Sequence, residues 1–360
     1  MLLSAAAASW WLWEAEQRDA ASRLQSDDAS GETGSAVVSG IRVKLPEDDA
    51  PHQNVMEWWY YNSHLHSQEG NEFSFHYVFF LVNSAVSYTA SQISLIDHQS
   101  GKHYTDQKQS PGNPSAGTAR GFNFALGDWG MAGSGGNDTL RIRTPEFAFD
   151  LTLTNSGPTV YQGGTGLLDF GRAGTSYYYS RPRMTLEGDL SIGSETYRVT
   201  GQSWFDHQWG DFRTSDLGWD WFALQLDDGA DIMLYQIRDR GSRPLLYSGT
   251  YTRNSVTEVL KEPDFSAESL GSWRSESTGT TYQTSWRVRI PSHRIDLQLT
   301  PVAPDSEVDA RSTTDNTYWE GAMKLTGSHR GKGFLEVSPA GPLKQDVSAT
   351  PYAGDKQDRH

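Results

Sequence analysis

The chain has 360 residues, a formal net charge of −15 and no cysteine. The absence of cysteine excludes disulfides and thiolate chemistry. The negative charge argues against a nucleic-acid partner and against electrostatic docking to an anionic membrane, because both need a basic surface. A chain of this length can bury a substantial core in one large domain or in two smaller ones.

The chain begins with an apolar segment, residues 2–13, and continues with a small-residue, acidic stretch to residue 40 that is typical of a linker. The apolar segment is too short to span a bilayer. It resembles the end of a signal or anchor sequence that lacks its basic start. We therefore expect a periplasmic or inner-membrane-tethered bacterial protein with peripheral membrane contact through this segment. A short amphipathic helix, on a cytoplasmic protein, is the alternative.

From residue 41 onward the pattern indicates β-strands, because apolar and polar side chains alternate or run apolar over short stretches. The clearest strand candidates are residues 71–82, 146–153, 222–226, 231–237 and 286–299. Turn-forming clusters lie at residues 110–120, 132–138, 155–166 and 301–316. No stretch after residue 30 shows a convincing helical period. The pattern predicts an all-β fold of antiparallel sandwiches or barrels.

A faint internal repeat favours two similar domains. Residues 201–206 and residues 331–336 both read Gly, any residue, Ser or Gly, an aromatic, any residue, an acid. Such a repeat fits two β-domains that end on comparable strands. The predicted organisation is an N-terminal segment with linker over 1–40, a first domain over 41–208, a second domain over 209–345 and a polar tail over 346–360.

The first candidate for chemistry is the run Glu-Trp-Trp-Tyr-Tyr at residues 57–61. On a strand, Glu57, Trp59 and Tyr61 share one face. A carboxyl group beside two aromatic rings would be desolvated, which would raise its pKa and make it a proton donor. The alternative is a glutamate at the rim that pairs with an arginine.

We predict no metal and no cofactor. His64 and His66 share a face of the same strand, but no third ligand stands at a suitable spacing. The sequence also lacks a phosphate-binding loop, a dinucleotide fingerprint and the Gly-x-Ser-x-Gly elbow of α/β-hydrolases.

The densest aromatic cluster is the run Trp-Phe-Asp-His-Gln-Trp-Gly at residues 204–210, followed by Trp-Asp-Trp at 219–221. On an extended strand Asp206 faces opposite to His207 and Trp209. An acid that orients His207 would fix its tautomer and leave the other ring nitrogen for substrate or water. A structural histidine that is hydrogen-bonded at a barrel corner is the alternative.

Two further segments carry candidate side chains. In residues 234–239, Tyr235 shares a face with Ile237, and Asp239 returns to that side. The aromatic side chains of residues 177–179 could line an apolar cavity. We expect Arg181 and Arg183 to pair with Glu57 or Asp206.

These motifs, in their order and over roughly residues 40–340, resemble the AttH/CrtC family. The residues that carry the resemblance are Pro51-His52, Glu57 to Tyr60, Tyr178-x-Ser180, Gly201 to Gly210 and Gly218 to Leu226. The family contains carotenoid 1,2-hydratases (hydroxyneurosporene synthases) and AttH-like lipocalin-type proteins. The resemblance implies two tandem lipocalin-like antiparallel β-barrel domains.

The hydratase branch of this family adds water to an isolated alkene without a cofactor. That reaction needs a desolvated acid, a π-rich wall for the developing cation and a positioned water. The resemblance implies His207, Trp209 and Tyr235 as catalytic residues. Ile237 stands where the family has an acid, so we expect the acid to be Asp206, Asp220 or Asp239. The expected substrate-binding residues are Glu57, Trp59, Tyr61, Tyr178, Trp204, Trp219 and Trp221.

Two functions are compatible with this reading. The first is a cofactor-independent lyase of the hydratase type that acts on a hydrophobic, isoprenoid-like or polyene-like substrate. It predicts that His207 and an acid meet in a deep apolar pocket between the two domains. The alternative is a non-catalytic, AttH-like periplasmic carrier of a lipid or hydrophobic small molecule that works with an ABC exporter.

Overall fold

The computed structural model describes residues 40–84, 86–112, 120–171, 174–212, 217–239 and 244–338. These residues form two antiparallel sheets with short 3-10 helices at η1 (Glu47–Asp49), η2 (Gln162–Gly164) and η5 (Pro291–His293). No helix among these described residues is long and apolar enough to cross a membrane. The apolar N-terminal segment and the polar tail, on which the expected location and membrane contact depend, lie outside the described residues.

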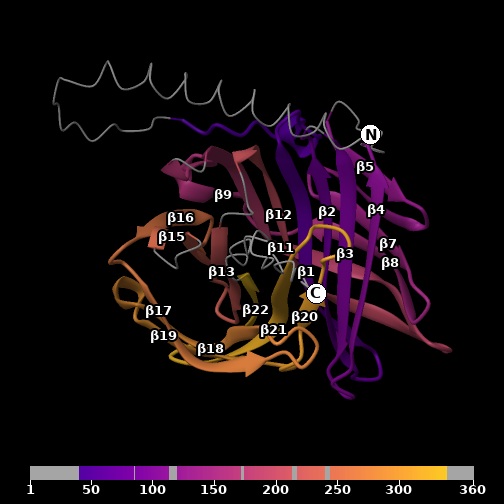
Figure 1. Cartoon of the computed structure of the whole chain (residues 1–360). Coiled ribbons are helices and arrows are strands. Elements are labelled where there is room, and N and C mark those ends of the chain that lie inside the picture. Colours follow the sequence, from indigo (N-terminus) through magenta and orange to yellow (C-terminus); the bar gives the residue numbers. More distant parts are fainter. Residues whose placement is uncertain are drawn as a thin grey trace, which may run out of the picture. The chain divides into compact units, whose positions relative to one another are not determined.

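The first sheet has the strand order β4-β3-β2-β1-β12-β11-β8-β7-β6-β5, with β9 and β10 paired to β11. Its edge strands β4 and β5 contact each other, so the sheet closes almost into a barrel (Figure 1). The strands are β1 Met56–Ser67, β2 Glu72–Val82, β3 Tyr88–Asp97, β4 His103–Pro111, β5 Phe122–Leu126, β6 Trp129–Ser134, β7 Asn137–Arg143, β8 Phe147–Asn155, β9 Val160–Tyr161, β10 Leu167–Asp169, β11 Gly174–Ile192 and β12 Glu195–Phe212.

The second sheet has the order β16-β15-β14-β13-β22-β21-β19-β18-β17, with β20 paired to β21, and it curves into a half-barrel. The chain passes from the first sheet to the second between residues 212 and 217. The strands are β13 Leu217–Leu226, β14 Asp231–Asp239, β15 Pro244–Arg253, β16 Val256–Lys261, β17 Ser266–Arg274, β18 Thr281–Ile290, β19 Ile295–Pro301, β20 Glu307–Asp309, β21 Thr317–Gly327 and β22 Gly331–Ser338.

Alternation along the strands separates an inward from an outward face in each sheet. The inward face of the first sheet forms one buried cluster rich in aromatic rings, including Trp59, Tyr61 and Phe205. The inward face of the second sheet forms another, which includes Phe222 and Trp319. Packed side chains of the described residues therefore fill both interiors.

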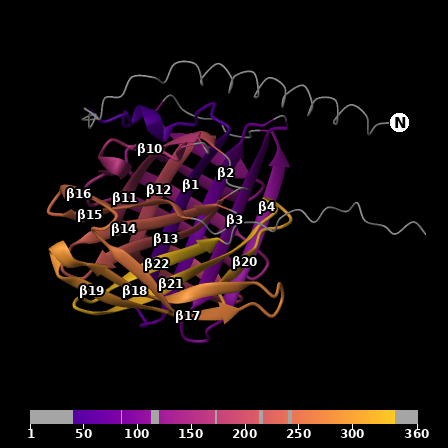
Figure 2. The same cartoon turned by 60° about the vertical axis from the view of Figure 1, so that its left-hand side comes forward.

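A third buried cluster, which we call the inter-sheet layer, joins the outward faces of the two sheets. Figure 2 shows β13 and β22 lying across β1 and β12 at this layer. Its buried apolar members are Tyr60, Val78, Leu168, Tyr178 and Trp204 from the first sheet and Trp221, Ala223, Met233, Tyr235, Ala322 and Phe334 from the second. Six of these eleven side chains are aromatic, and the five that are tyrosine or tryptophan carry a hydroxyl or an indole N–H into a buried position.

The expected all-β fold of two lipocalin-like sheets is confirmed. Four of the strand candidates coincide with β2, β8, β13 and β14, two of them starting one residue early. The candidate at 286–299 is instead two strands, because the chain turns at Pro291–His293 and Arg294 adopts a φ of 55°. Because the short connection preserves the alternation of apolar residues, a sequence pattern of period 2 does not reveal the turn.

The internal repeat has a structural reason. Gly201 begins the repeated stretch in β12, and a Cβ atom there would lie 2.1 Å from the carbonyl oxygen of His64. A Cβ atom on Gly331, in β22, would lie 2.3 Å from the carbonyl oxygen of Gln225. In both sheets a neighbouring strand approaches too closely for any side chain. The acids that end the two stretches, Asp206 and Glu336, both face the inter-sheet layer.

Candidate acid site between the sheets

Two glutamates stand opposite each other in the inter-sheet layer. Glu320 of β21 is the register partner of Glu336 of β22. Directly opposite residues on antiparallel strands project to the same face, with Cβ atoms about 4.5–5.5 Å apart. Tyr60 of the first sheet donates a hydrogen bond to Glu320 Oε1 at 2.7 Å. Two carboxylates at such a separation repel each other, so this pair retains a proton that isolated glutamates would lose.

The surroundings raise the pKa of both glutamates. Burial, reinforced by the charge of Glu336, raises the pKa of Glu320 well above its ordinary value, against the hydrogen bond from Tyr60. Desolvation raises the pKa of Glu336 to about 7, against a hydrogen bond with Trp219. Glu320 is fully buried, and its Oε2 has no hydrogen-bond partner among the described residues. Glu336 keeps part of its surface exposed, so it is the member that can reach a bound molecule.

Asp206 faces the same layer from β12. Its Oδ1 accepts hydrogen bonds from Ser180 Oγ at 2.5 Å and Trp204 Nε1 at 2.8 Å. Its Oδ2 accepts one from Tyr178 Oη at 2.7 Å. Trp221 of the second sheet donates in turn to Tyr178 Oη at 3.0 Å. Burial raises the pKa of Asp206 to about 6 in spite of these bonds. These hydrogen bonds hold the carboxyl group of Asp206 in place and fix the positions of the Tyr178 and Trp204 rings.

Partly exposed apolar side chains border the layer. They come from both sheets and are Trp58, Phe80, Phe170, Trp219, Ile237 and Leu246. Tyr235 lies inside this border, and burial raises the pKa of its phenol, which therefore stays protonated. Acids with raised pKa values beside exposed aromatic surface are a candidate functional site with a physical rationale.

His207 lies on the other face of β12, inside the first sheet. Its Nε2 is 2.8 Å from Glu57 Oε1, and both side chains are fully buried. His52 Nδ1 is 2.7 Å from the same oxygen, and the His52 backbone N–H donates to Glu57 Oε2 at 2.7 Å. Trp209 stacks on the His52 ring with centroids 4.2 Å apart. The acid that orients His207 is therefore Glu57.

The electrostatics of Glu57 differ from the expectation. Burial acts to raise its pKa, but hydrogen bonds with His207 and His52 leave that pKa below its ordinary value. The prediction of a proton donor with a raised pKa was wrong, because two imidazoles stabilise the carboxylate. The alternative, a rim glutamate paired with arginine, was wrong as well.

The arginine partners were also mispredicted. Arg181 Nη2 bonds Asp49 Oδ1 at 2.7 Å, with both side chains buried. Arg183 Nε lies 3.0 Å from Asp231. Neither arginine pairs with Glu57 or Asp206 as expected. Asp49 lies in η1 and could not be selected from spacing alone.

The structure divides the predicted site residues between several places. Those in or beside the inter-sheet layer are Asp206, Tyr178, Trp204, Trp219, Trp221 and Tyr235. Those inside the first sheet are Glu57, Trp59, Tyr61, His207 and Trp209. Asp220 pairs with Arg238, and burial raises its pKa against that pairing. Asp239 ends β14. His207 and the inter-sheet acids thus lie on opposite faces of β12.

Glu320 and Glu336 were not recognised from the sequence. A signal was present, because the internal repeat aligns Glu336 with Asp206. The missing element was the strand register that sets the two glutamates opposite each other.

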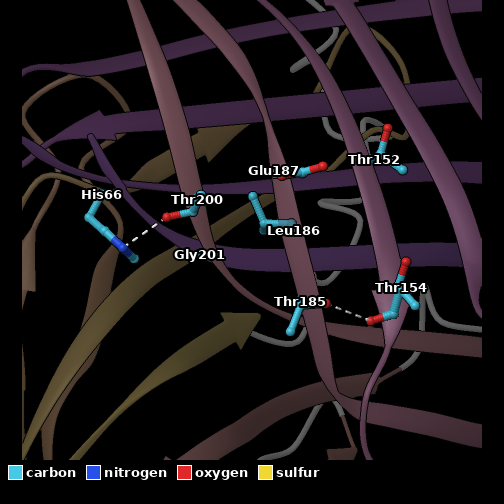
Figure 3. A pocket seen from close by; sticks show the side chains of 8 residues that line it. All are labelled: His66, Thr152, Thr154, Thr185, Leu186, Glu187, Thr200 and Gly201. Carbon is cyan, nitrogen blue, oxygen red and sulfur yellow. Dashed lines mark hydrogen bonds between the residues drawn. The ribbon is translucent and has the colours of Figure 1, made fainter. Parts of the chain in front are cut away.

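A surface groove of about 380 Å³ lies elsewhere on the first sheet (Figure 3). It is lined mostly by polar side chains: His66, Thr152, Thr154, Thr185, Leu186, Glu187, Thr200 and Gly201. His66 Nε2 is hydrogen-bonded to Thr200 Oγ1 at 2.9 Å. None of the predicted site residues lines this groove, which therefore differs from the apolar pocket expected between the domains.

Comparison with known proteins places these features in context. A family described as AttH-like matches residues 36–340. A crystal structure of an AttH protein from Nitrosomonas europaea is 28% identical, with a TM-score of 0.76 over 84% of this chain and 99% of that one. Kievitone hydratase from Nectria haematococca shares the fold, with 19% identity and a TM-score of 0.69 over 86% of this chain and 96% of its own.

A curated relative is the dehydratase asqC of Emericella nidulans. It is 26% identical over 206 residues, which cover 53% of this chain and 52% of the relative. The match therefore spans about half the length of that protein.

Proposed function

Because the chain belongs to the AttH-like family, we propose that it is a cofactor-independent lyase of the hydratase or dehydratase type. The observation that carries this proposal is that Glu320 and Glu336 stand opposite each other beside aromatic side chains, where burial raises the pKa of both carboxyl groups. The named activities of kievitone hydratase and of the dehydratase asqC support the reaction class. We propose a hydrophobic substrate with an isoprenoid or polyene chain, since apolar rings border the acids.

The proposed reaction needs only an acid, a base and water. Protonated Glu336 transfers its proton to one carbon of a C=C bond, and the π electrons form the new C–H bond. Positive charge develops on the other carbon, where the faces of neighbouring rings stabilise it. Water then forms the C–O bond at that carbon and returns one proton to the carboxylate pair, which restores the starting state. The reverse sequence removes water from an alcohol.

The remaining residues of the layer support this step. Tyr60 holds Glu320 in place through the 2.7 Å hydrogen bond, so the second carboxyl faces Glu336. Asp206 orients Tyr178, which accepts a bond from Trp221 and so ties the rings of both sheets together. Fixed dipoles and rings around the reacting carbon avoid the reorganisation that water would need. Asp206 and Tyr178 are positioning residues in this proposal.

A second candidate function is a non-catalytic periplasmic carrier that passes a lipid or hydrophobic small molecule to an ABC exporter. The three hydrogen bonds on Asp206 favour it, because a structural acid is satisfied in this way. The partly exposed apolar border would then contact the cargo.

One experiment separates the two functions. The purified full chain is incubated with kievitone and with open-chain isoprenoid alkenes in ¹⁸O-labelled water, and the products are analysed by mass spectrometry. Incorporation of ¹⁸O that depends on the protein supports the lyase. Retention of an added lipid in native mass spectra, with no ¹⁸O incorporation into any compound of the panel, supports the carrier.

A further inference from the structure

Three metal-ligating groups converge inside the first sheet. His52, Glu57 and His207 each offer one ligand atom, and the three atoms lie within 4.8 Å of one another. Two imidazoles and one carboxylate form the protein ligand set of several catalytic zinc centres, in which water takes the fourth position. We propose that this His52-Glu57-His207 cluster binds one Zn²⁺ ion. The expectation of no metal site was based on His64 and His66, which are not part of this cluster.

Strand register builds the cluster. Glu57 lies on β1 opposite Trp209, and His207 lies on β12 opposite Trp59. The glutamate and the histidine are therefore diagonal neighbours on adjacent strands and project to the same face. His52 comes from the segment before β1 and closes the cluster from the side. Its side chain is 22% exposed, which provides an entry path for an ion, whereas the other two ligands are fully buried.

The present distances are those of hydrogen bonds, 2.7 Å and 2.8 Å from Glu57 Oε1 to the two ring nitrogens. Ligands at about 2.0–2.2 Å from a tetrahedral zinc ion stand roughly 3.3 Å apart. Each ring nitrogen must therefore move about half an ångström farther from Glu57 Oε1 to admit the ion. His52 can move because it lies outside the strands and stacks flat on Trp209, and rotation of the Glu57 carboxylate must supply the separation from His207.

An oxygen atom lies near the outer ring nitrogen of each histidine. When zinc occupies Nε2 of His207 and Nδ1 of His52, each ring carries its proton on the opposite nitrogen. His207 Nδ1 lies 3.4 Å from Tyr179 Oη, and His52 Nε2 lies 3.6 Å from Asp48 Oδ1. Metal-bound histidines regularly donate that second N–H to an oxygen acceptor, which orients the ring.

The site is independent of the proposed lyase chemistry, because Asp206 and His207 project to opposite faces of β12. Its test is direct. The full chain, purified without a histidine tag and dialysed against a chelator, is titrated with Zn²⁺ in a calorimeter. We expect one high-affinity ion per chain, and X-ray absorption of the loaded protein showing two imidazole ligands at about 2.0–2.1 Å.

Two variants and a control define the ligands. His52→Ala removes a ligand at a partly exposed position and should weaken binding by more than the roughly 10–100-fold that loss of an outer partner costs. His52→Phe keeps a ring beside Trp209 and should bind as weakly as His52→Ala. His66→Ala, which removes an exposed histidine outside the cluster, should bind like the parent. Equal binding by the parent and both His52 variants, or no binding by the parent, would overturn the proposal.

Discussion

Glu320 and Glu336 face each other across neighbouring strands, and both point into the layer that joins the two sheets. Two carboxyl groups that are close together and largely removed from water cost stability when both ionise, which favours the protonated form of one of them. The same relationship therefore yields predictions about unfolding and about chemistry.

Glu336→Gln should change the pH dependence of stability. The pKa of Glu336 is about 7 in the folded protein, above the ordinary 4.5. Its contribution to stability is thus full below about pH 4.5 and is lost as the pH rises through 7. Glutamine carries no charge and avoids the free-energy cost of ionising Glu336 in the folded protein. As the pH rises from 5 to 8, the unfolding free energy of the variant should therefore increase by about 1–3 kcal/mol relative to that of the parent.

Urea unfolding of both proteins at the two pH values measures this gain. The control is Glu187→Gln, which removes the charge of an exposed glutamate outside the inter-sheet layer. A pH-independent offset for Glu336→Gln would show that Glu336 titrates like a surface carboxyl.

Tyr60→Phe should destabilise the protein and raise the pKa of Glu320 further. The phenol supplies the hydrogen bond to Glu320 Oε1, and Oε2 already lacks a partner among the described residues. Leaving a buried carboxyl group unsatisfied costs about 1–3 kcal/mol. Chemical denaturation would detect this loss, whereas Tyr197→Phe, which removes only a hydroxyl bonded to Glu195 at the surface, should be nearly silent. Equal unfolding midpoints for the two variants would mean that the Tyr60 bond contributes nothing.

Asp206→Ala should cost more than Asp206→Asn. Alanine leaves three buried donors without an acceptor, those of Ser180, Trp204 and Tyr178. Asparagine keeps one oxygen, which can still accept the bonds from Ser180 and Trp204. We expect a loss of about 2–4 kcal/mol for alanine and about half of that for asparagine. If the two variants unfold alike, the hydrogen bonds on Asp206 are not what holds the rings.

The buried ion pair of Asp49 and Arg181 should contribute strongly to the stability of the fold. Asp49 accepts bonds from Arg181 Nη2 and from the backbone N–H of Gly135 at 2.6 Å. Asp49→Asn removes the carboxylate that bonds the guanidinium directly and leaves Asp138 as the nearby acid, so we expect a loss approaching the roughly 3–5 kcal/mol of a broken buried ion pair. Arg198→Ala, at an exposed pair, should cost less than 1 kcal/mol, or about the value of a surface ion pair. Thermal unfolding of both variants provides the comparison, and similar midpoints would contradict the assignment of Asp49 as the essential counter-ion.

Much of the fold could be predicted because the strands either alternate or run apolar over short stretches between turn-forming residues. The split of residues 204–210 into an Asp206 face and a His207 face follows from period 2 alone, and the structure shows the same split. The internal repeat indicated two related sheets, and Gly201 and Gly331 explain it through close strand contacts.

What could not be predicted depends on contacts between distant segments. Glu320 became a candidate only once β21 and β22 were in register. His52 and Glu57 are neighbours in the sequence, yet nothing in their spacing shows that His207 completes the cluster. Arg181 pairs with Asp49 because η1 places Asp49 beside it, and no periodicity in the sequence encodes the position of η1.

The central claim is that the Glu320–Glu336 pair supplies the proton for addition or removal of water. The most direct test follows ¹⁸O incorporation from labelled water into a turned-over alkene, for the parent and for Glu336→Gln, from pH 5 to pH 9. The parent rate should fall as the pH rises through about 7, because Glu336 then loses its proton. Glu336→Gln should lose incorporation at every pH while remaining folded. Incorporation at the parent rate in that variant, or a parent rate that does not change with pH, would contradict the claim.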